Sequence, residues 1–172
     1  MKAGFLTRAA FVGAFSVFLI SCEEGSGSLA GSGFRDQYIV ARSALEEGRY
    51  DTAMRRYERM IPTAGQAAPR LKLEYAHAQL RAGDYAGARQ TATALAQGRS
   101  DGGRQAALAV AGAAAHELAL QAKAQGDRAT AKALFAEARS AMEEVVKTAP
   151  KMDPHGALAG RVATIKVQEK TL

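Results

Sequence analysis

Only a few residue types in this 172-residue chain could do chemistry, and their spacing suits none of the common metal sites. The three histidines, His77, His116 and His155, lie far apart in the sequence. Glu74 and His77 form one Glu-x-x-His pair, but a di-metal carboxylate site needs a second pair and further Glu residues. Zinc would need His or Cys ligands at closer spacing. We therefore expect no bound metal.

Motifs for nucleophilic catalysis and nucleotide binding are also missing from the sequence. Cys22 is the single cysteine, and no Gly-x-Ser-x-Gly or phosphate-binding glycine loop ending in Lys-Ser/Thr occurs. The carboxylate pairs Glu46–Glu47 and Glu143–Glu144 lie near Arg or Lys residues, which is typical of solvated helix surfaces. We therefore expect a protein that is not an enzyme and that uses no cofactor.

The amino terminus has the pattern of a secretory signal peptide. Lys2 and Arg8 provide positive charge, and the twelve residues 9–20 carry no charge. Twelve helical residues span about 18 Å, which is well short of the ~30 Å hydrocarbon core of a membrane. The sequence therefore predicts a cleaved leader over residues 1–21 and not a membrane-spanning helix.

The leader ends in Leu19-Ile20-Ser21-Cys22, which resembles the lipobox of bacterial lipoproteins. The resemblance implies cleavage after Ser21, lipid on the Cys22 thiol and acylation of the new amino terminus, and three acyl chains anchor a protein firmly. Glu23 stands where an Asp would favour inner-membrane retention, so the resemblance implies an outer-membrane anchor with the domain in the periplasm. A free cysteine after an ordinary leader, or an uncleaved anchor, is the alternative.

The mature chain would begin with a tether and carry a modest positive charge. Residues 22–33 are rich in Gly and Ser, and the eleven residues after Cys22 have a typical reach of ~18 Å. Loss of residues 1–21 leaves 21 basic and 17 acidic residues, a net charge of +4. This charge would suit an acidic partner or anionic lipid. No Lys/Arg run with interleaved aromatic residues indicates nucleic-acid binding.

Composition and periodicity predict an all-α domain over residues 34–172. Ala, the best helix former, occupies 39 positions, and only four Pro interrupt the chain. Apolar residues recur at helical spacing from Tyr38 onward, and Asp51 and Asp127 stand where helix N-caps are expected. The expected helices end at Gly48, Pro62, Gly83, Gly98, Gly126 and Pro150, with a loop over 99–103 and a last helix over about 154–170.

One turn pattern is repeated along the chain. The segment Gly48-Arg-Tyr-Asp-Thr-Ala53 returns 35 residues later as Gly83-Asp-Tyr-Ala-Gly-Ala88, and more weakly at Gly126. Glycine can end a helix in the left-handed conformation, and the small alanine lets two helices approach closely. The residues expected to pack at these turns are Gly48, Tyr50, Ala53, Tyr57, Gly83, Tyr85, Ala88, Gly126, Ala131 and Phe135.

With these turns, residues 34–150 resemble tetratricopeptide helix–turn–helix units, whose period is 34 residues. The third unit departs from the pattern, because Arg128 replaces the expected Tyr and its turn lies 43 residues after the second. The resemblance implies a short right-handed superhelix of about three antiparallel hairpins, with the last helix as a C-terminal cap. A plain Ala-rich antiparallel bundle is the alternative.

In this register, the first helix of each hairpin contributes to a shallow concave face. Basic side chains would surround aliphatic and aromatic ones, which suits an extended partner segment with an acidic group or free carboxylate. Exposed Arg residues are common on helices, and either His77 or His116 could instead satisfy a neighbouring helix. The expected members are Arg35, Tyr38, Arg42, Arg70, Leu73, His77, His116, Leu120 and Lys123. Charge reversal at Arg42 and Arg70 is expected to abolish partner capture without altering helicity.

Together these features predict a membrane-anchored module for protein–protein interaction. It would serve as a scaffold or accessory for an envelope complex in outer-membrane assembly, pilus formation or secretion, and its partners would be envelope proteins. The alternative is a free-standing structural lipoprotein that binds peptidoglycan or anionic lipid through a plain helical bundle.

Overall fold

The computed structural model describes residues 32–100 and 102–172, and these residues form an all-α structure with no strand among them. The prediction of an all-helical domain is confirmed. The predicted leader, Cys22 and nearly all of the predicted tether lie outside the described residues. The seven α-helices are α1 (Ser32–Glu46), α2 (Tyr50–Met60), α3 (Ala68–Ala82), α4 (Tyr85–Gln97), α5 (Gly102–Ala124), α6 (Arg128–Thr148) and α7 (Ala157–Lys170).

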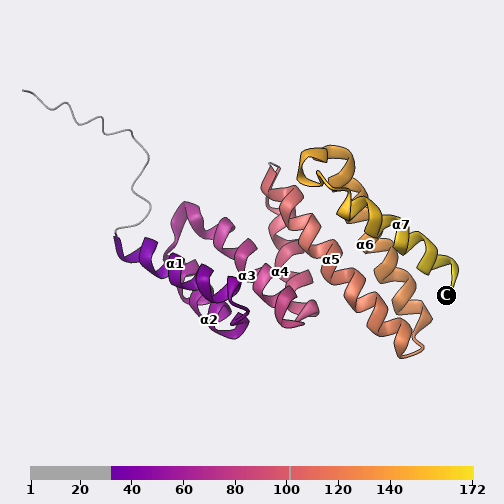
Figure 1. Cartoon of the computed structure of the whole chain (residues 1–172), viewed down its shortest axis with the longest axis horizontal. Coiled ribbons are helices and arrows are strands. Elements are labelled where there is room, and N and C mark those ends of the chain that lie inside the picture. Colours follow the sequence, from indigo (N-terminus) through magenta and orange to yellow (C-terminus); the bar gives the residue numbers. More distant parts are fainter. Residues whose placement is uncertain (1–31, 101) are drawn as a thin grey trace, which may run out of the picture.

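The helices form an elongated row in which each one packs mainly against the helices before and after it in the chain (Figure 1). Helices α1 and α2 lie at one end of the row, α3 and α4 in the middle, and α5, α6 and α7 at the other end. Besides these sequential contacts, α3 also packs against α5. The first helices of the second and third hairpins therefore come together in the middle of the row.

Three turns share one backbone geometry. Gly48, Gly83 and Gly126 follow the ends of α1, α3 and α5 with φ values of +78°, +84° and +80°. At Gly48, for example, its N–H donates to the Leu45 carbonyl and the next N–H donates to the Ala44 carbonyl, and the other two turns repeat both bonds. This pair of hydrogen bonds satisfies two carbonyl groups at the helix end. It requires a residue in the left-handed conformation, which explains the glycine.

The residue after each glycine is the N-cap of the next helix, which corrects one prediction. The Asp84 and Asp127 carboxylates accept hydrogen bonds from the N–H groups of Gly87 and Thr130. In the first hairpin this position is occupied by Arg49, which makes no side-chain cap, and Asp51 lies inside the first turn of α2. The prediction of Asp51 as an N-cap was therefore wrong by two positions. The predicted loop over 99–103 is also shorter, because α5 begins at Gly102.

The core is built around two large aromatic side chains. Tyr57 of α2 and Phe135 of α6 are fully buried, and each lies four residues after a fully buried alanine, Ala53 or Ala131. Tyr57 is surrounded by residues of α1, α2 and α3, whereas Phe135 is surrounded by residues of α5, α6 and α7. Between them, at the corresponding position of α4, stands the small residue Ala92. The middle of the row is therefore packed mainly with small and aliphatic side chains.

Gly112 of α5 lies directly against α6. A Cβ atom at Gly112 would lie 3.0 Å from Met142 Cγ and 3.2 Å from the Ala138 carbonyl oxygen. The absence of a side chain at Gly112 therefore sets how closely the two helices pack.

Candidate functional site

The predicted face begins with a group of four charged and polar side chains between α1 and α3, which we call the α1–α3 cluster: Tyr38, Arg42, Arg70 and Glu74. Arg42 Nη1 lies 2.8 Å from both carboxylate oxygens of Glu74, and Arg42 Nε donates to Glu46 at 2.7 Å. The hydrogen bond to Glu46 and the charge of Glu74 raise the pKa of Arg42, whose positive charge is therefore fixed.

The aromatic ring of Tyr38 joins the two helices in the same cluster. Its hydroxyl donates to Glu74 Oε1 at 3.3 Å and accepts from Arg70 Nη2 at 3.1 Å. The Arg70 guanidinium also lies over the Tyr38 ring, 5.3 Å from its centroid. The structure thus brings Tyr38, Arg42 and Arg70 together, but their charges and hydrogen bonds are directed at one another and at Glu74.

Sequence reasoning missed Glu74 as the centre of this cluster. It was considered only as half of the Glu-x-x-His pair with His77. The available signal was the sequence separation of 32 residues between Arg42 and Glu74, which is close to one repeat. It places Arg42 on α1 and Glu74 on α3, the first helices of successive hairpins. Two partners hold the Glu74 carboxylate, so a metal-ligand role for it is not supported. Within the described residues, no three His, Cys, Asp or Glu lie close enough together to hold a metal ion.

Further along α3, the face becomes more accessible and has fewer internal partners. The His77 side chain is exposed, and partial desolvation by the protein around its ring lowers its pKa. Arg81 Nε lies 3.4 Å from the Tyr50 hydroxyl, and its guanidinium lies 5.9 Å from the centroid of that ring. Arg81 forms no ion pair with any acid in the described part of the chain.

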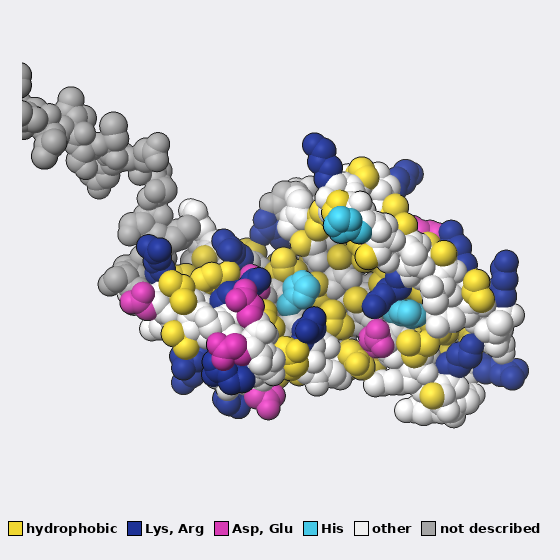
Figure 2. Space-filling model, in the orientation of Figure 1, with side chains coloured by type: hydrophobic (Ala, Val, Ile, Leu, Met, Phe, Trp, Pro, Cys, Tyr) yellow, Lys and Arg dark blue, Asp and Glu magenta, His cyan; other side chains and the backbone are white. Residues whose placement is uncertain are grey.

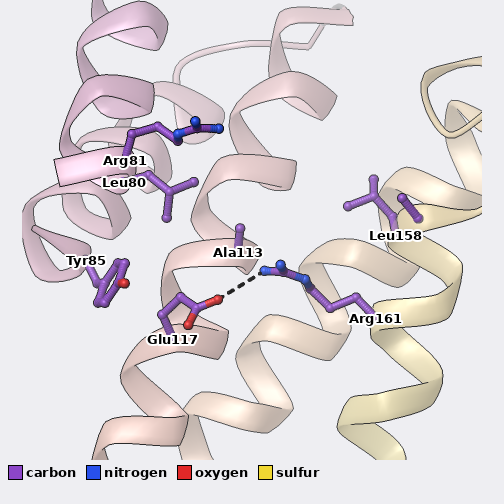
Figure 3. Close-up of a pocket in the computed structure, with 8 residues that line it drawn as sticks. Leu80, Arg81, Tyr85, Ala113, Glu117, Leu158 and Arg161 are labelled. Carbon is purple, nitrogen blue, oxygen red and sulfur yellow. Dashed lines mark hydrogen bonds and ion pairs between the residues drawn. The ribbon is translucent and has the colours of Figure 1, made fainter. Parts of the chain in front are cut away.

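Next to Arg81 is a hollow of about 520 Å³ between α3, α5 and the beginning of α7, which we call the inner hollow (Figure 3). Its opposite walls carry Arg81 on α3 and Arg161 on α7, and Arg161 Nη1 reaches Glu117 of α5 at 3.4 Å. Figure 2 shows hydrophobic side chains along the middle of the molecule with charged and His side chains among them. The residues that line the inner hollow are Leu80, Arg81, Tyr85, Ala113, Glu117, Ala157, Leu158 and Arg161.

The α5 members of the predicted face are not part of an open surface, which corrects the prediction for them. His116 is only 6% exposed, because its Nε2 pairs with Gln168 Oε1 of α7 at 2.8 Å and its ring packs against Phe135. Leu120 packs in the core that α5, α6 and α7 share, and Lys123 Nζ donates to Thr171 Oγ1 at 3.0 Å. Helix α7 therefore covers this part of α5.

Two other predicted members lie apart from the hollow's charged walls. Leu73 packs against apolar residues of α4 and α5, so its side chain belongs to the core of the middle hairpin. Arg35 is exposed in the first turn of α1 and makes no hydrogen bond or ion pair with the other described residues. The sequence also missed Arg81 and Arg161 as members of the face.

The described helices carry no span long and apolar enough to cross a membrane. Comparisons of the chain with protein-family models, with curated proteins and with solved structures find no significant match.

Proposed function

We propose that this protein is a non-enzymatic module for protein–protein interaction and that the inner hollow holds an extended segment of the partner. The observation that carries the proposal is the composition of the hollow's walls. Leu80 and Leu158 offer apolar contact. Among the described residues, Arg81 has no acidic partner and Arg161 has one, Glu117, at 3.4 Å. A partner segment with an acidic side chain or a terminal carboxylate would satisfy both guanidinium groups.

In this proposal the helices form a short right-handed superhelix of the tetratricopeptide type. Three features support it: the equal geometry of the turns at Gly48, Gly83 and Gly126, the buried alanines after them, and the packing of each helix on its chain neighbours. Helix α7 acts as the terminal cap, because its residues Val162 and Ile165 cover the apolar surface of α5 and α6 that a further repeat would otherwise bury.

We further propose that lipid on Cys22 anchors the protein to the outer membrane, with the helical domain in the periplasm. The lipobox-like sequence supports the anchor, and the Gly/Ser-rich residues after it support a tether between anchor and domain. The protein would then act as a scaffold or accessory for an envelope complex.

The test is crosslinked capture of partners from membranes that contain the full chain or the Arg81→Glu variant. We expect the variant to lose the captured partner, because the reversed charge would repel the partner's acidic group. Arg128→Glu, at an exposed position of α6 away from the hollow's lining, is the matched control and should capture normally. Circular dichroism should show equal helicity in all three proteins.

Two outcomes would count against the proposal. Capture that is unchanged by Arg81→Glu would reject the inner hollow as the partner site. A chain that sediments alone after gentle detergent extraction and crosslinking would instead favour a free-standing structural lipoprotein.

A Cys22→Ser variant tests the anchor separately, since it should leave the membrane fraction if lipid alone holds the protein there.

A further inference from the structure

Helix α2 carries three arginines that have no acidic partner among the described residues: Arg55, Arg56 and Arg59. Elsewhere in the described chain, arginines commonly pair with Glu residues, as Arg89 does with Glu137 at 2.7 Å. Arg55 instead binds Thr52, and Arg59 Nε donates to the backbone carbonyl of Arg55 at 3.1 Å. Positive charge on this helix therefore remains available for a ligand.

Two of these arginines line a second hollow, of about 300 Å³, between α1 and α2. Its walls are Gln37 of α1 and Arg56, Arg59 and Met60 of α2. The Nε atom of Arg56 is buried and has no hydrogen-bond partner. A buried N–H donor without an acceptor is costly, so the Arg56 side chain would gain a hydrogen bond by turning this N–H toward an acceptor in the hollow.

The acidic residues of α2 do not neutralise this hollow. At 100° per residue, Asp51 and Glu58 lie roughly 140° and 160° around the helix axis from Arg56. Asp36 of α1 precedes Gln37 and is exposed, and no ion pair joins it to Arg56 or Arg59. Two arginines and one glutamine therefore line the hollow, with no acidic residue among the residues that line it.

We propose that this α1–α2 hollow binds the phosphate group of an anionic phospholipid. Guanidinium groups match phosphate oxygens with paired, charge-assisted hydrogen bonds, and the Gln37 amide offers a further donor. Met60, which is 3% exposed, completes the wall of the hollow. This site is separate from the inner hollow and takes a different class of ligand.

The position of the hollow in the chain favours a lipid as the source of the phosphate. Helix α1 begins at Ser32, ten residues after Cys22, and ten extended residues span at most about 35 Å. If Cys22 is lipidated, as proposed above, α1 and α2 are the helices nearest the anchor in the chain. Each arginine held near an anionic membrane surface strengthens binding, and a pair of them would orient the domain on the membrane.

The test follows the Arg56 Nε–H resonance of the full chain in a neutral detergent by NMR. Two probes are titrated separately: dihexanoyl phosphatidylglycerol and inorganic phosphate. We expect the phosphatidylglycerol probe to shift the resonance and to saturate at a concentration at least tenfold lower than phosphate. In the Arg59→Gln variant the affinity should fall several-fold, whereas Arg128→Gln, which removes the same charge from α6, should change it less than twofold.

Each other result decides against the proposal. No response to either probe would reject an anion site at this hollow. Equal affinity for the two probes would assign the site to free phosphate and reject the lipid. An equal loss in Arg128→Gln and Arg59→Gln would mean that overall charge, and not this hollow, attracts the lipid. The Arg81→Glu variant should leave the titration unchanged, so the failure of the partner site and of this site can be distinguished.

Discussion

The two ends of the row differ on their inner face, which is the face formed by the first helix of each hairpin. Their turns nevertheless share one geometry. At the amino-terminal end, α1 and α3 are joined by the α1–α3 cluster, in which Arg42 and Tyr38 meet the Glu74 carboxylate. At the carboxy-terminal end, α7 lies over α5 and α6 and buries Ile165 completely. One end thus keeps a charged inner face whose groups pair with one another, and the other covers an apolar one.

The two histidines His77 and His116 illustrate this difference between the ends. His77 and His116 lie on the inner side of α3 and α5, yet the first is exposed and the second is 6% exposed under α7. The same face of successive hairpins therefore has different surroundings, because the neighbour that covers it differs. The open part of the inner face is confined to the middle of the row, where the inner hollow lies.

The largest expected effect comes from removing the aromatic centre of the carboxy-terminal end. Phe135→Ala should lower the free energy of unfolding by about 3–5 kcal/mol, because it leaves a cavity among α5, α6 and α7. Urea denaturation measures the loss. Relative to the wild type, the variant should show a larger increase of the hydrogen-exchange rate in α7 than in α1. An equal increase at both ends would contradict the separation of the two cores.

A smaller effect is expected at the contact between α5 and α6. Gly112→Ala should destabilise the protein by about 1–2 kcal/mol, since the new methyl group would press on Met142 Cγ at 3.0 Å and on the Ala138 carbonyl oxygen at 3.2 Å, and the backbone oxygen must move to relieve the contact. Gly160→Ala in α7 is the matched control, because nothing lies within 4 Å of its Cβ position. That substitution should stabilise the protein by about 0.5–1 kcal/mol through helix propensity alone. Thermal unfolding of both variants distinguishes the two results.

The smallest expected effect on stability is at Tyr57, the buried aromatic residue of the amino-terminal end. The Tyr57 hydroxyl is buried without a hydrogen-bond partner, and this burial raises the pKa of Tyr57. Tyr57→Phe should therefore leave stability unchanged or raise it by up to about 1 kcal/mol. A loss of more than about 1 kcal/mol on urea denaturation would indicate that the hydroxyl has a partner in solution, and the two ends would then differ less than described here.

Local sequence patterns predicted the helices and their ends well, because glycine in the left-handed conformation and apolar periodicity act within a few residues. Gly83 and Gly126 stand where the sequence placed them, after α3 and α5. The error at Asp51 has a local cause too, since the cap position after the glycine holds Arg49 in the first hairpin alone.

The candidate site was harder to predict, because its members meet across long sequence distances. Arg42 and Glu74 are 32 residues apart, and His116 and Gln168 are 52 residues apart. Helical periodicity assigns each of them to a face, but it does not say which neighbouring helix covers that face. The sequence predicted a capping last helix and left open that His116 satisfies a neighbouring helix, but it did not connect the two; the structure pairs His116 with Gln168 of α7.

The packing of each helix on its neighbours in the chain has a kinetic consequence. Contacts between residues close in sequence give a low contact order, and helical proteins of this kind fold in microseconds to milliseconds. A chain of this design can form its structure piece by piece from either end, without waiting for distant segments to meet.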